Sequence, residues 1–309
     1  MLDFRQLRYF ICLVEEGSVT RAARRVHIVQ PALSAQIAKL EDELGYPLFT
    51  RTPKGMVPTA AGRKLYAAFL PVHDEFNRLS QQALGGKGEL VGDVRFGAVA
   101  TVAQGVIGEV LSDFLELHPR VSLSVVEGYS GFLVDQVLTG RLDAAIVNQS
   151  GSLGALSTTP VVEEPFEFIT SSRERRLPQA IPFRSLADFR LVLPSRSHGL
   201  RLILQNILAA EGLELMPVLE LDSVPVILQM VQRGGVATVL PRLAVLRAVE
   251  AGEVHAHTIV SPSFTRNAVC VRRTSPALSP AAAAFVEFAI HRVRAAGGLA
   301  LDVPQPDES

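Results

Sequence analysis

The stretch VQPALSAQIAKLEDEL, residues 29–44, decides how the rest of the chain is interpreted. Leu33, Ile37, Leu40 and Leu44 recur at intervals of four, three and four, which places them on one stripe of a helix. The opposite face carries small or polar side chains, namely Pro31, Ser34, Ala35 and Ala38, flanked by Gln30 and Lys39. Such a helix is anchored by one side and offers a slender, hydrogen-bonding surface on the other.

Two shorter helices are predicted before this stretch. Residues 18–28, SVTRAARRVHI, form a helix opened by Ser18, which is a good N-cap residue. Apolar residues at i, i+3, i+4 and i+7 predict an earlier helix over residues 4–16, closed by Gly17. Three short helices with tight connections, the third slender at its N-terminal half, suit a DNA major groove about 12 Å wide. A three-helix packing unit that binds nothing is the alternative.

Residues 15–62 support a more specific interpretation. EEGSVTRAARRVHIVQPALSAQIAKLEDELGYPLFTRTPKGMVPTAAG resembles, nearly position for position, the helix-turn-helix of the LysR-type transcriptional regulators. The resemblance is strong over residues 1–65 and looser after residue 90. It implies an α+β winged helix-turn-helix head, a long linker helix and an α/β two-lobed periplasmic-binding-protein-like domain. The expected boundaries are 1–59 for the head, 60–84 for the dimerisation helix, 85–90 for a hinge, 91–162 with 267–295 for lobe I, 163–266 for lobe II and 296–309 for a tail.

Composition agrees with a globular chain of two or three units, since 48% of the 309 residues are hydrophobic and 20% are charged. The chain has no run of 18 apolar residues and no signal-peptide core, so a cytoplasmic location is expected. Cys12 and Cys270 lie in an apolar helix and in a predicted strand. We interpret them as buried free thiols; a redox pair is the alternative.

Charge is distributed unevenly along the chain. Residues 1–87 hold 12 Lys and Arg against 8 Asp and Glu, a balance of +4. Residues 88–309 hold 18 against 23, a balance of −5, so the whole chain has a net charge of −1. The basic excess therefore coincides with the segment where DNA contact is expected.

The candidate DNA contacts lie on the second and third helices. Arg21, Arg24 and Arg25 are placed to reach phosphates, although ordinary solvated arginines are the alternative. Base edges or nearby phosphates are the expected partners of the polar residues Gln30, Ser34 and Gln36, which share their helix with Pro31 and Ala35. The acidic run Glu41-Asp42-Glu43 would be repelled by DNA, so the N-terminal half of the helix should enter the groove, as the helix dipole also favours.

The sequence departs from the family at two positions of this helix. Val29 stands where Ser or Ala is common, so no side-chain cap is expected. Ala35 stands where Arg or Gln is frequent, which removes a base-reading side chain. Specificity then depends on Gln30, Ser34, the wing and DNA shape.

A wing and a long helix follow. Residues 48–59, LFTRTPKGMVPT, form two extended runs about the turn Pro53-Lys54-Gly55, and Arg51 and Lys54 are placed to meet phosphates or a minor groove. A plain surface hairpin is the alternative.

Thr59 is the expected cap of a helix over residues 60–83. Its apolar residues are spaced four, three, four, three and four, as in a coiled-coil seam: Leu65, Phe69, Val72, Phe76, Leu79 and Ala83. The helix would span roughly 36 Å, too long for the small head to cover its stripe. Dimerisation would bury the stripe and supply the two-fold symmetry of paired half-sites. We expect Pro71 to bend this helix without ending it, and residues 84–89, LGGKGE, to form a linker.

Strands and helices alternate after residue 90. Strands are predicted at VGDVRFGAV, VSLSVVEG, LDAAIVNQ, FEFITS, LVLPS, VATVLP and AVCVRR. Helices are predicted over residues 106–117, 133–138, 200–211, 224–232, 244–250 and 281–294. This order implies a mostly parallel sheet, split into two lobes.

Ligands bind open α/β sheets beyond the carboxyl ends of the strands. This rule selects Thr101, Ser130 and Ser195, and the resemblance places the family's effector pocket at the same positions. Hydroxyls and helix N-terminal amides suit a small anion, often a carboxylate, and Arg196 or Arg201 could pair with it. The alternative is that these residues only cap helices.

Thr238 lies on a predicted strand near the same cleft. It belongs to GGVATVLP, in which Val236 replaces the second glycine of the family pattern, so the cleft could be narrowed there.

Enzyme motifs are absent: the sequence has no GxSxG, HExxH, CxxC pair, Walker loop or GxGxxG. His255 and His257 lack partners in the sequence for a metal site and are interpreted as packed or solvated side chains. The leading hypothesis is a transcriptional regulator, an activator that could also repress its own gene. It would have no cofactor, would not bind a membrane, and would bind double-stranded promoter DNA, a small-molecule effector, RNA polymerase and its own copies as a dimer or tetramer. A regulator without effector dependence, a solute-binding protein and an enzyme on an α/β scaffold are the alternatives.

Overall fold

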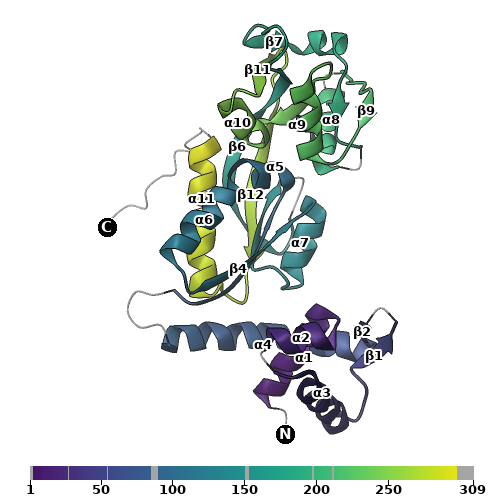
Figure 1. Ribbon diagram of the computed structural model, residues 1–309, viewed down its shortest axis with the longest axis vertical. Helices are drawn as coiled ribbons and strands as arrows, with labels where there is room; N and C mark the ends of the chain where they lie inside the picture. Colours follow the sequence, from purple (N-terminus) through teal and green to yellow (C-terminus); the bar gives the residue numbers. More distant parts are fainter. Residues whose placement is uncertain are drawn as a thin grey trace. The chain divides into compact units, whose positions relative to one another are not determined.

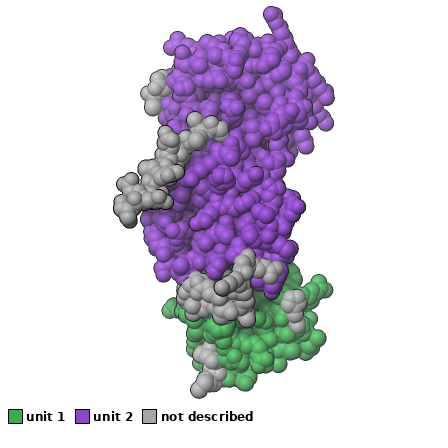
Figure 2. All heavy atoms as spheres, turned by 90° about the vertical axis from the view of Figure 1, so that its left-hand side faces the viewer, with its two compact units in different colours: residues 1–84 green, residues 85–309 purple. Residues whose placement is uncertain are grey.

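A computed structural model describes residues 3–26, 28–53, 55–84, 90–149, 153–196, 198–210 and 212–297. The chain forms two compact units, Met1–Leu84 and Gly85–Ser309, which Figure 2 distinguishes by colour. The predicted linker over residues 85–89 and the predicted tail beyond residue 297 lie outside the described residues.

The first unit is a small helical head with a two-stranded wing and a long helix (Figure 1). Its elements are α1 (Phe4–Glu16), α2 (Val19–Arg25), α3 (Gln30–Leu44), β1 (Phe49–Thr52), β2 (Gly55–Pro58) and α4 (Ala60–Leu84). The predicted ends of the first helix are confirmed, since α1 has a capping box at Asp3 and ends at Gly17 with φ 59°. Ser18 caps α2 by accepting a hydrogen bond from the Arg21 amide, as predicted.

The stripe predicted on α3 is the face that anchors it. Leu33, Ile37 and Leu40 are buried and join the head core, while Leu44 packs against that core partly exposed. Burying each of these side chains contributes roughly 1.5–3 kcal/mol relative to exposure, which is enough to fix the rotation of the helix. The opposite face is therefore left to solvent.

The wing is held to the head by backbone contacts. β1 pairs antiparallel with β2 in the register Phe49↔Pro58 to Thr52↔Gly55, which confirms the predicted hairpin. Gly55 has φ 123°, and a Cβ there would lie 2.3 Å from the carbonyl oxygen of Gly17. The next amide, of Met56, donates to that same oxygen at 2.9 Å. A side chain at position 55 would consequently push the wing away from α1.

Helix α4 continues through Pro71, so the prediction that proline does not end it is confirmed. Thr59 Oγ1 accepts a hydrogen bond from the Gly62 amide at 3.0 Å, which confirms the predicted cap. Val72 and Phe76, two residues of the predicted seam, are 50% and 48% exposed. Phe76 also packs against Phe4, with ring centroids 4.0 Å apart.

The second unit is a mixed α/β structure around an eight-stranded sheet. Its helices are α5 (Ala100–Val102), a π-helical segment (Ala103–Ile107), α6 (Gly108–Leu117), α7 (Ser130–Leu138), a 3-10 helix (Phe183–Asp188), α8 (Gly199–Ala210), α9 (Val224–Arg233), α10 (Arg242–Glu250) and α11 (Pro280–Gly297). Its strands are β3 (Gly92–Ala98), β4 (Val121–Glu127), β5 (Ala144–Asn148), β6 (Leu156–Ser171), β7 (Ala180–Pro182), β8 (Val192–Leu193), β9 (Leu219–Glu220), β10 (Thr238–Pro241), β11 (Val254–Val260) and β12 (Thr265–Arg273).

The prediction of a mostly parallel sheet is wrong. The sheet order is β4-β3-β5-β12-β6-β11-β7, with β10 also pairing β6. β4, β3 and β5 run parallel to one another, but β12 pairs antiparallel with both β5 and β6, and β10 and β11 pair antiparallel with β6. The reason is that β6 and β12 are long strands that pass side by side through the middle of the unit, and every printed pairing of either strand is antiparallel.

Two separate hydrophobic cores lie along these long strands. The first holds buried residues of 94–162 and 268–293 together with Leu243, and the second holds buried residues of 166–264. We call the parts around them lobe I and lobe II. The boundary between the lobes crosses β6, whose buried residues change core between Val162 and Phe166.

Several strands were not predicted from the sequence, and several helices have other ends than predicted. β7, β9 and the first half of β6 were not predicted, and α11 extends to Gly297, beyond the predicted end at residue 294. Helix begins at Ala100 instead of residue 106, through the π-helical segment, and α7 begins at Ser130 instead of residue 133. Both early starts bring helix N-termini to the ends of β3 and β4. None of the described helices is both long and apolar enough to cross a membrane.

Candidate DNA interface and ligand cleft

The N-terminal half of α3 presents an exposed face without bulky apolar groups. Gln30, Pro31, Ser34 and Ala35 are all exposed, while Gln36 is half-buried. The N-cap residue Val29 is 68% exposed and makes no side-chain hydrogen bond, as expected from its sequence. Gln30 is held by Thr20, whose hydroxyl donates to its Oε1 at 3.1 Å. The structure therefore brings these predicted contact residues onto one accessible surface.

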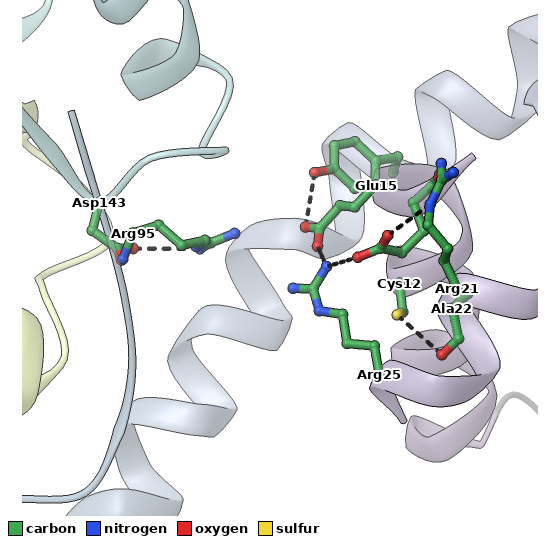
Figure 3. A network of polar contacts seen from close by, with 9 residues as sticks. Cys12, Glu15, Arg21, Ala22, Arg25, Arg95 and Asp143 are labelled. Atoms are coloured by element: carbon green, nitrogen blue, oxygen red, sulfur yellow. Dashed lines mark hydrogen bonds and ion pairs between the residues drawn. The ribbon is translucent and has the colours of Figure 1, made fainter. Parts of the chain in front are cut away.

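The three arginines of α2 differ in their partners, and Figure 3 shows those of Arg21 and Arg25. Arg25 pairs with Glu15 at 2.7 Å and with Glu16 at 3.2 Å. Arg21 also reaches Glu16, through an ion pair of 3.4 Å and a hydrogen bond to the Glu16 carbonyl oxygen. Arg24 is exposed and makes no ion pair with any described residue, so its charge is the most available of the three.

The wing places Arg51 on an exposed strand position, whereas Lys54 lies outside the described residues. The sequence-based view of the acidic run needs correction at Glu41. Its Oε1 accepts hydrogen bonds from the amides of Leu48 at 2.6 Å and Phe49 at 3.0 Å. Glu41 thus anchors the start of the wing to α3, a role that its position in an acidic run concealed.

Both cysteines are free and buried, which confirms that interpretation. Burial raises the pKa of the Cys12 thiol to about 11 and that of Cys270 to about 12. The Cys12 thiol donates to the carbonyl oxygen of Ala22 (Figure 3). Protonated, buried thiols are poor nucleophiles, so neither is placed for redox chemistry.

A cavity of about 420 Å³ opens in the second unit, between the two lobes. Its described walls come from the ends of β3 and β4, the start of α7, and the loops before α8 and α9. They are formed by Val99, Ala100, Thr101, Glu127, Gly128, Tyr129, Ser130, Phe132, Asn148, His198, Gly199 and Asp222. Two of the predicted effector residues, Thr101 and Ser130, are therefore brought together in one cavity.

Thr101 is the most informative of these residues. It is only 2% exposed, and its Oγ1 has no hydrogen-bond partner in the described part of the chain. An unpaired buried hydroxyl costs free energy unless something completes it.

Buried contacts hold Ser130 and its neighbours in place. Ser130 Oγ accepts a hydrogen bond from the Asn148 amide at 3.1 Å, and the Asn148 side chain accepts one from Arg266. Arg266 is fully buried with Glu164, to which its Nε donates at 2.7 Å. Glu164 in turn accepts from the Leu243 amide at 2.7 Å, at the start of α10. The wall of the cavity is thus tied to the strands that join the lobes.

A second set of contacts joins the lobes across the cavity. Asp222 of lobe II accepts from the amide of Ser195 at 2.8 Å and from its hydroxyl at 3.0 Å. Tyr129 of lobe I donates to the same carboxylate at 3.2 Å. Burial would raise the pKa of Asp222, but the hydrogen bonds from Ser195 and Tyr129 hold it below its usual value. Sequence reasoning missed Asp222 and His198, because neither follows a long strand.

The other predicted effector residues lie elsewhere. Arg196 is exposed and pairs with Glu214 at 3.4 Å and Glu220 at 4.0 Å. Arg201 is buried and donates to the carbonyl oxygen of Leu215. The expectation that either arginine faces the ligand is therefore not supported by its position. Thr238 is fully buried on β10, and its hydroxyl has no hydrogen-bond partner among the described residues; it does not belong to the described cavity wall.

Two further predictions concern residues outside the cavity. Val236 packs partly buried against the core of lobe II and does not line the cavity. His257 is buried and bonded to Thr170 and to the carbonyl oxygen of Pro178. On another strand end of this unit, the Asp143 carboxylate accepts hydrogen bonds from the backbone amide and the guanidinium of Arg95 (Figure 3).

Comparisons with known proteins match both units. Residues 4–63 match the model of the bacterial regulatory helix-turn-helix protein, lysR family, and residues 87–294 match the LysR substrate binding domain. The nitrogen assimilation regulatory protein nac of Klebsiella aerogenes is 28% identical over 94% of this chain and 95% of its own. The HTH-type transcriptional regulator CzcR of Bacillus thuringiensis is 29% identical over 88% of this chain and 89% of its own.

Solved structures show the same architecture. A full-length OxyR from Pseudomonas aeruginosa superposes with a TM-score of 0.73 at 26% identity, covering 95% of each chain. CbnR in complex with its target DNA superposes with a TM-score of 0.62 at 20% identity, covering 94% of this chain and all of its own, and so supports the fold alone. The exposed α3 face, the lobed second unit and the two family matches lead to one conclusion: the chain belongs to the LysR family of DNA-binding transcriptional regulators, with a helix-turn-helix head followed by an effector-binding domain.

Proposed function

We propose that this regulator reads promoter DNA with the N-terminal half of α3, binds as a dimer or tetramer, and changes its DNA binding when a small molecule occupies the cavity between the lobes. The orientation of α3 supports the first part. Leu33, Ile37 and Leu40 are buried on one side, which leaves Gln30 and Ser34 on the accessible side. Both carry groups that hydrogen-bond to base edges in a major groove.

Phosphate contacts come from basic residues around this face. Arg24 on α2 and Arg51 on the wing are exposed, and Arg21 can join them when DNA competes with Glu16 for its guanidinium. Lys54 belongs to the same proposed set by its place in the wing turn. Pro31 and Ala35 keep the helix slim enough to lie close to the bases, and Gln36 lies at the edge of the contact.

The DNA proposal is tested with fragments captured by the purified protein from a genomic library. Replacing Gln30 and Ser34 by Ala should reduce selectivity for the captured sequence over random DNA far more than it reduces binding to random DNA. Arg141→Ala, an exposed charge of the second unit, is the control and should change neither. Unchanged selectivity in the double variant would show that α3 is not the reading helix.

Self-association is proposed through α4. The helix leaves Val72 and Phe76 half-exposed at a spacing of four residues, and an apolar seam of this kind is buried by a second copy. Val72→Glu should shift the protein toward monomer in analytical ultracentrifugation and weaken DNA binding together. The side chains of Leu79 and Ala83, which complete the predicted seam, lie outside the described residues. A wild-type monomer would refute this part.

The effector part depends mainly on Thr101. Thr101, whose buried hydroxyl has no partner among the described residues, and the neighbouring Ser130 line a cavity large enough for a small molecule. A ligand that contacts both lobes shifts their relative position, and this couples the cavity to the head. The proposed shift of the lobes also involves Ser195, which donates two hydrogen bonds to Asp222, and Thr238 on β10. Activation of a promoter, contact with RNA polymerase and action in the cytoplasm are proposed on the family relationship.

A thermal-shift screen of metabolites with the full chain tests the effector part. A true effector should raise the melting temperature of wild type and not of Thr101→Val, which keeps the shape of the side chain but removes the hydroxyl. Wild-type DNA binding that no metabolite alters would instead favour a regulator without effector dependence.

A further inference from the structure

The cavity between the lobes has an unusual balance of charge for a site expected to bind an anion. Its described wall contains two carboxylates, Glu127 and Asp222, and no lysine or arginine. The arginines nearest in sequence do not line the described wall: Arg196 pairs with Glu214 and Glu220. Arg201 is buried and donates through Nη2 to the Leu215 carbonyl oxygen, while its Nη1 has no partner among the described residues. A carboxylate entering here would meet like charges and no cation.

The remaining polar groups do not reverse that balance. His198 is 6% exposed, and burial lowers the pKa of its imidazole, which favours the uncharged ring. Its Nδ1 accepts from the Leu200 amide at 3.1 Å, which uses one of the donors at the start of α8. The Ser195 amide, just before α8, is used by Asp222. The carboxylate of Asp222 therefore already occupies the anion-binding position of lobe II.

Two aromatic rings complete this side of the cavity. Tyr129 and Phe132 line it and are each about half exposed. The face of an aromatic ring attracts a cation, and the attraction grows in a partly dry site. Thr101, which lines the same cavity, is an independent sign of a ligand, since its buried hydroxyl has no hydrogen-bond partner among the described residues.

We infer that the cavity selects a small organic cation, a protonated amine carried on an apolar body, with Asp222 as its anchor and Glu127 as a second carboxylate at the rim. The inference rests on the proposed effector site and names the class of ligand. The amine takes the place of Tyr129 on the Asp222 carboxylate, and the apolar body lies against Tyr129 and Phe132. Binding thereby breaks the hydrogen bond that joins the lobes in the unliganded chain.

Three probes of nearly equal shape test the charge preference: benzylammonium, benzyl alcohol and benzoate. Binding to the full chain is followed by ligand-observed NMR at pH 7 and moderate salt. We expect benzylammonium to bind at least about tenfold more tightly than benzoate, with benzyl alcohol between them. Benzoate binding as tightly as benzylammonium or more tightly overturns the inference and leaves the effector cavity standing. Binding of none of the three overturns the cavity as an effector site as well.

Matched variants locate the preference. Asp222→Asn removes the charge but retains hydrogen-bonding groups, and should abolish most of the preference for benzylammonium over benzyl alcohol. Glu127 is exposed, so Glu127→Gln should fold normally even if Asp222→Asn does not. It should reduce the preference for benzylammonium over benzyl alcohol by a smaller factor than Asp222→Asn. Tyr129→Phe frees the carboxylate and should strengthen benzylammonium binding while leaving benzyl alcohol unchanged. An undiminished preference in Asp222→Asn would overturn the role of Asp222.

Discussion

The DNA-binding head and the ligand cleft present their polar groups in opposite ways. In the head, the described candidate contacts lie within residues 21–51, on α2, α3 and the wing strand β1, and a compact core lies behind the two helices. In the cleft, the wall comes from residues 99–222 of two lobes and is supported by ion pairs and hydrogen bonds buried behind it. The head should therefore tolerate changes of its functional surface, whereas the cleft should respond to changes far from its ligand.

The buried ion pair behind the cleft offers the largest effect. Arg266→Met leaves Glu164 buried without its partner, and we expect a loss of about 3–5 kcal/mol from the unfolding free energy of the second unit. Urea unfolding of the full chain measures it. The double variant with Glu164→Gln should lose less, because no charge is left unpaired. A loss under about 1 kcal/mol in the single variant would contradict the view that the cleft, unlike the head, depends on a buried ion pair.

A core change in the head comes next. Leu40 is fully buried on the anchored face of α3, and Leu40→Ala should cost about 2–5 kcal/mol in the unfolding free energy of the head, with DNA binding lost in proportion to unfolding. Ser34→Ala on the opposite, exposed face of the same helix should change stability by less than about 0.5 kcal/mol. Circular dichroism with increasing urea compares the two. Equal costs would contradict the assignment of Leu40 to the buried face of α3 and of Ser34 to its exposed face.

The anchor of the wing should show an intermediate effect. Glu41→Gln weakens two charge-assisted hydrogen bonds to the amides of Leu48 and Phe49, and we expect a loss of about 1–2 kcal/mol. Hydrogen exchange at these two amides should become faster. Asp42→Asn, at an exposed neighbouring position, removes the same charge and serves as the control. If both variants raise DNA affinity equally and neither changes stability or hydrogen exchange, Glu41 acts through its charge and not as an anchor.

Replacing Arg24 and replacing Arg21 should change the salt dependence of DNA binding by different amounts. Arg24→Ala should reduce the slope of log affinity against log salt by about 1, as expected for one lost phosphate contact. Arg21→Ala should reduce it by less, because Glu16 already engages this guanidinium. Equal changes would indicate that DNA binding breaks the Arg21–Glu16 pair completely.

The smallest expected effect is the contribution of the exposed Arg21–Glu16 ion pair to the unfolding free energy of the head. Glu16→Gln should alter the unfolding free energy of the head by no more than about 1 kcal/mol, since the arginines that it meets are largely in solvent. DNA affinity should rise slightly, because Arg21 is released toward phosphates. A loss of several kcal/mol would show that the head, like the cleft, depends on its ion pairs.

Most of the head could be predicted from sequence because its determinants are local. The period of the apolar residues, the cap at Ser18 and the glycine at position 17 specify α1 to α3 within a few residues of where they act. The strand-end rule also located Thr101 and Ser130, because each directly follows a strand at the start of a helix.

The sequence by itself determined which face of α3 is anchored, where the wing turns, and which hydroxyls follow β3 and β4. Only the tertiary structure decided the antiparallel course of β12 beside β6, the engagement of Arg196 and Arg201 away from the cavity, and the charge of the cavity wall. Tyr129 and Asp222 are 93 residues apart, and Glu164 and Arg266 are 102 apart. Contacts at such separations follow from how the two lobes pack around their shared strands, which no local period, cap or turn encodes.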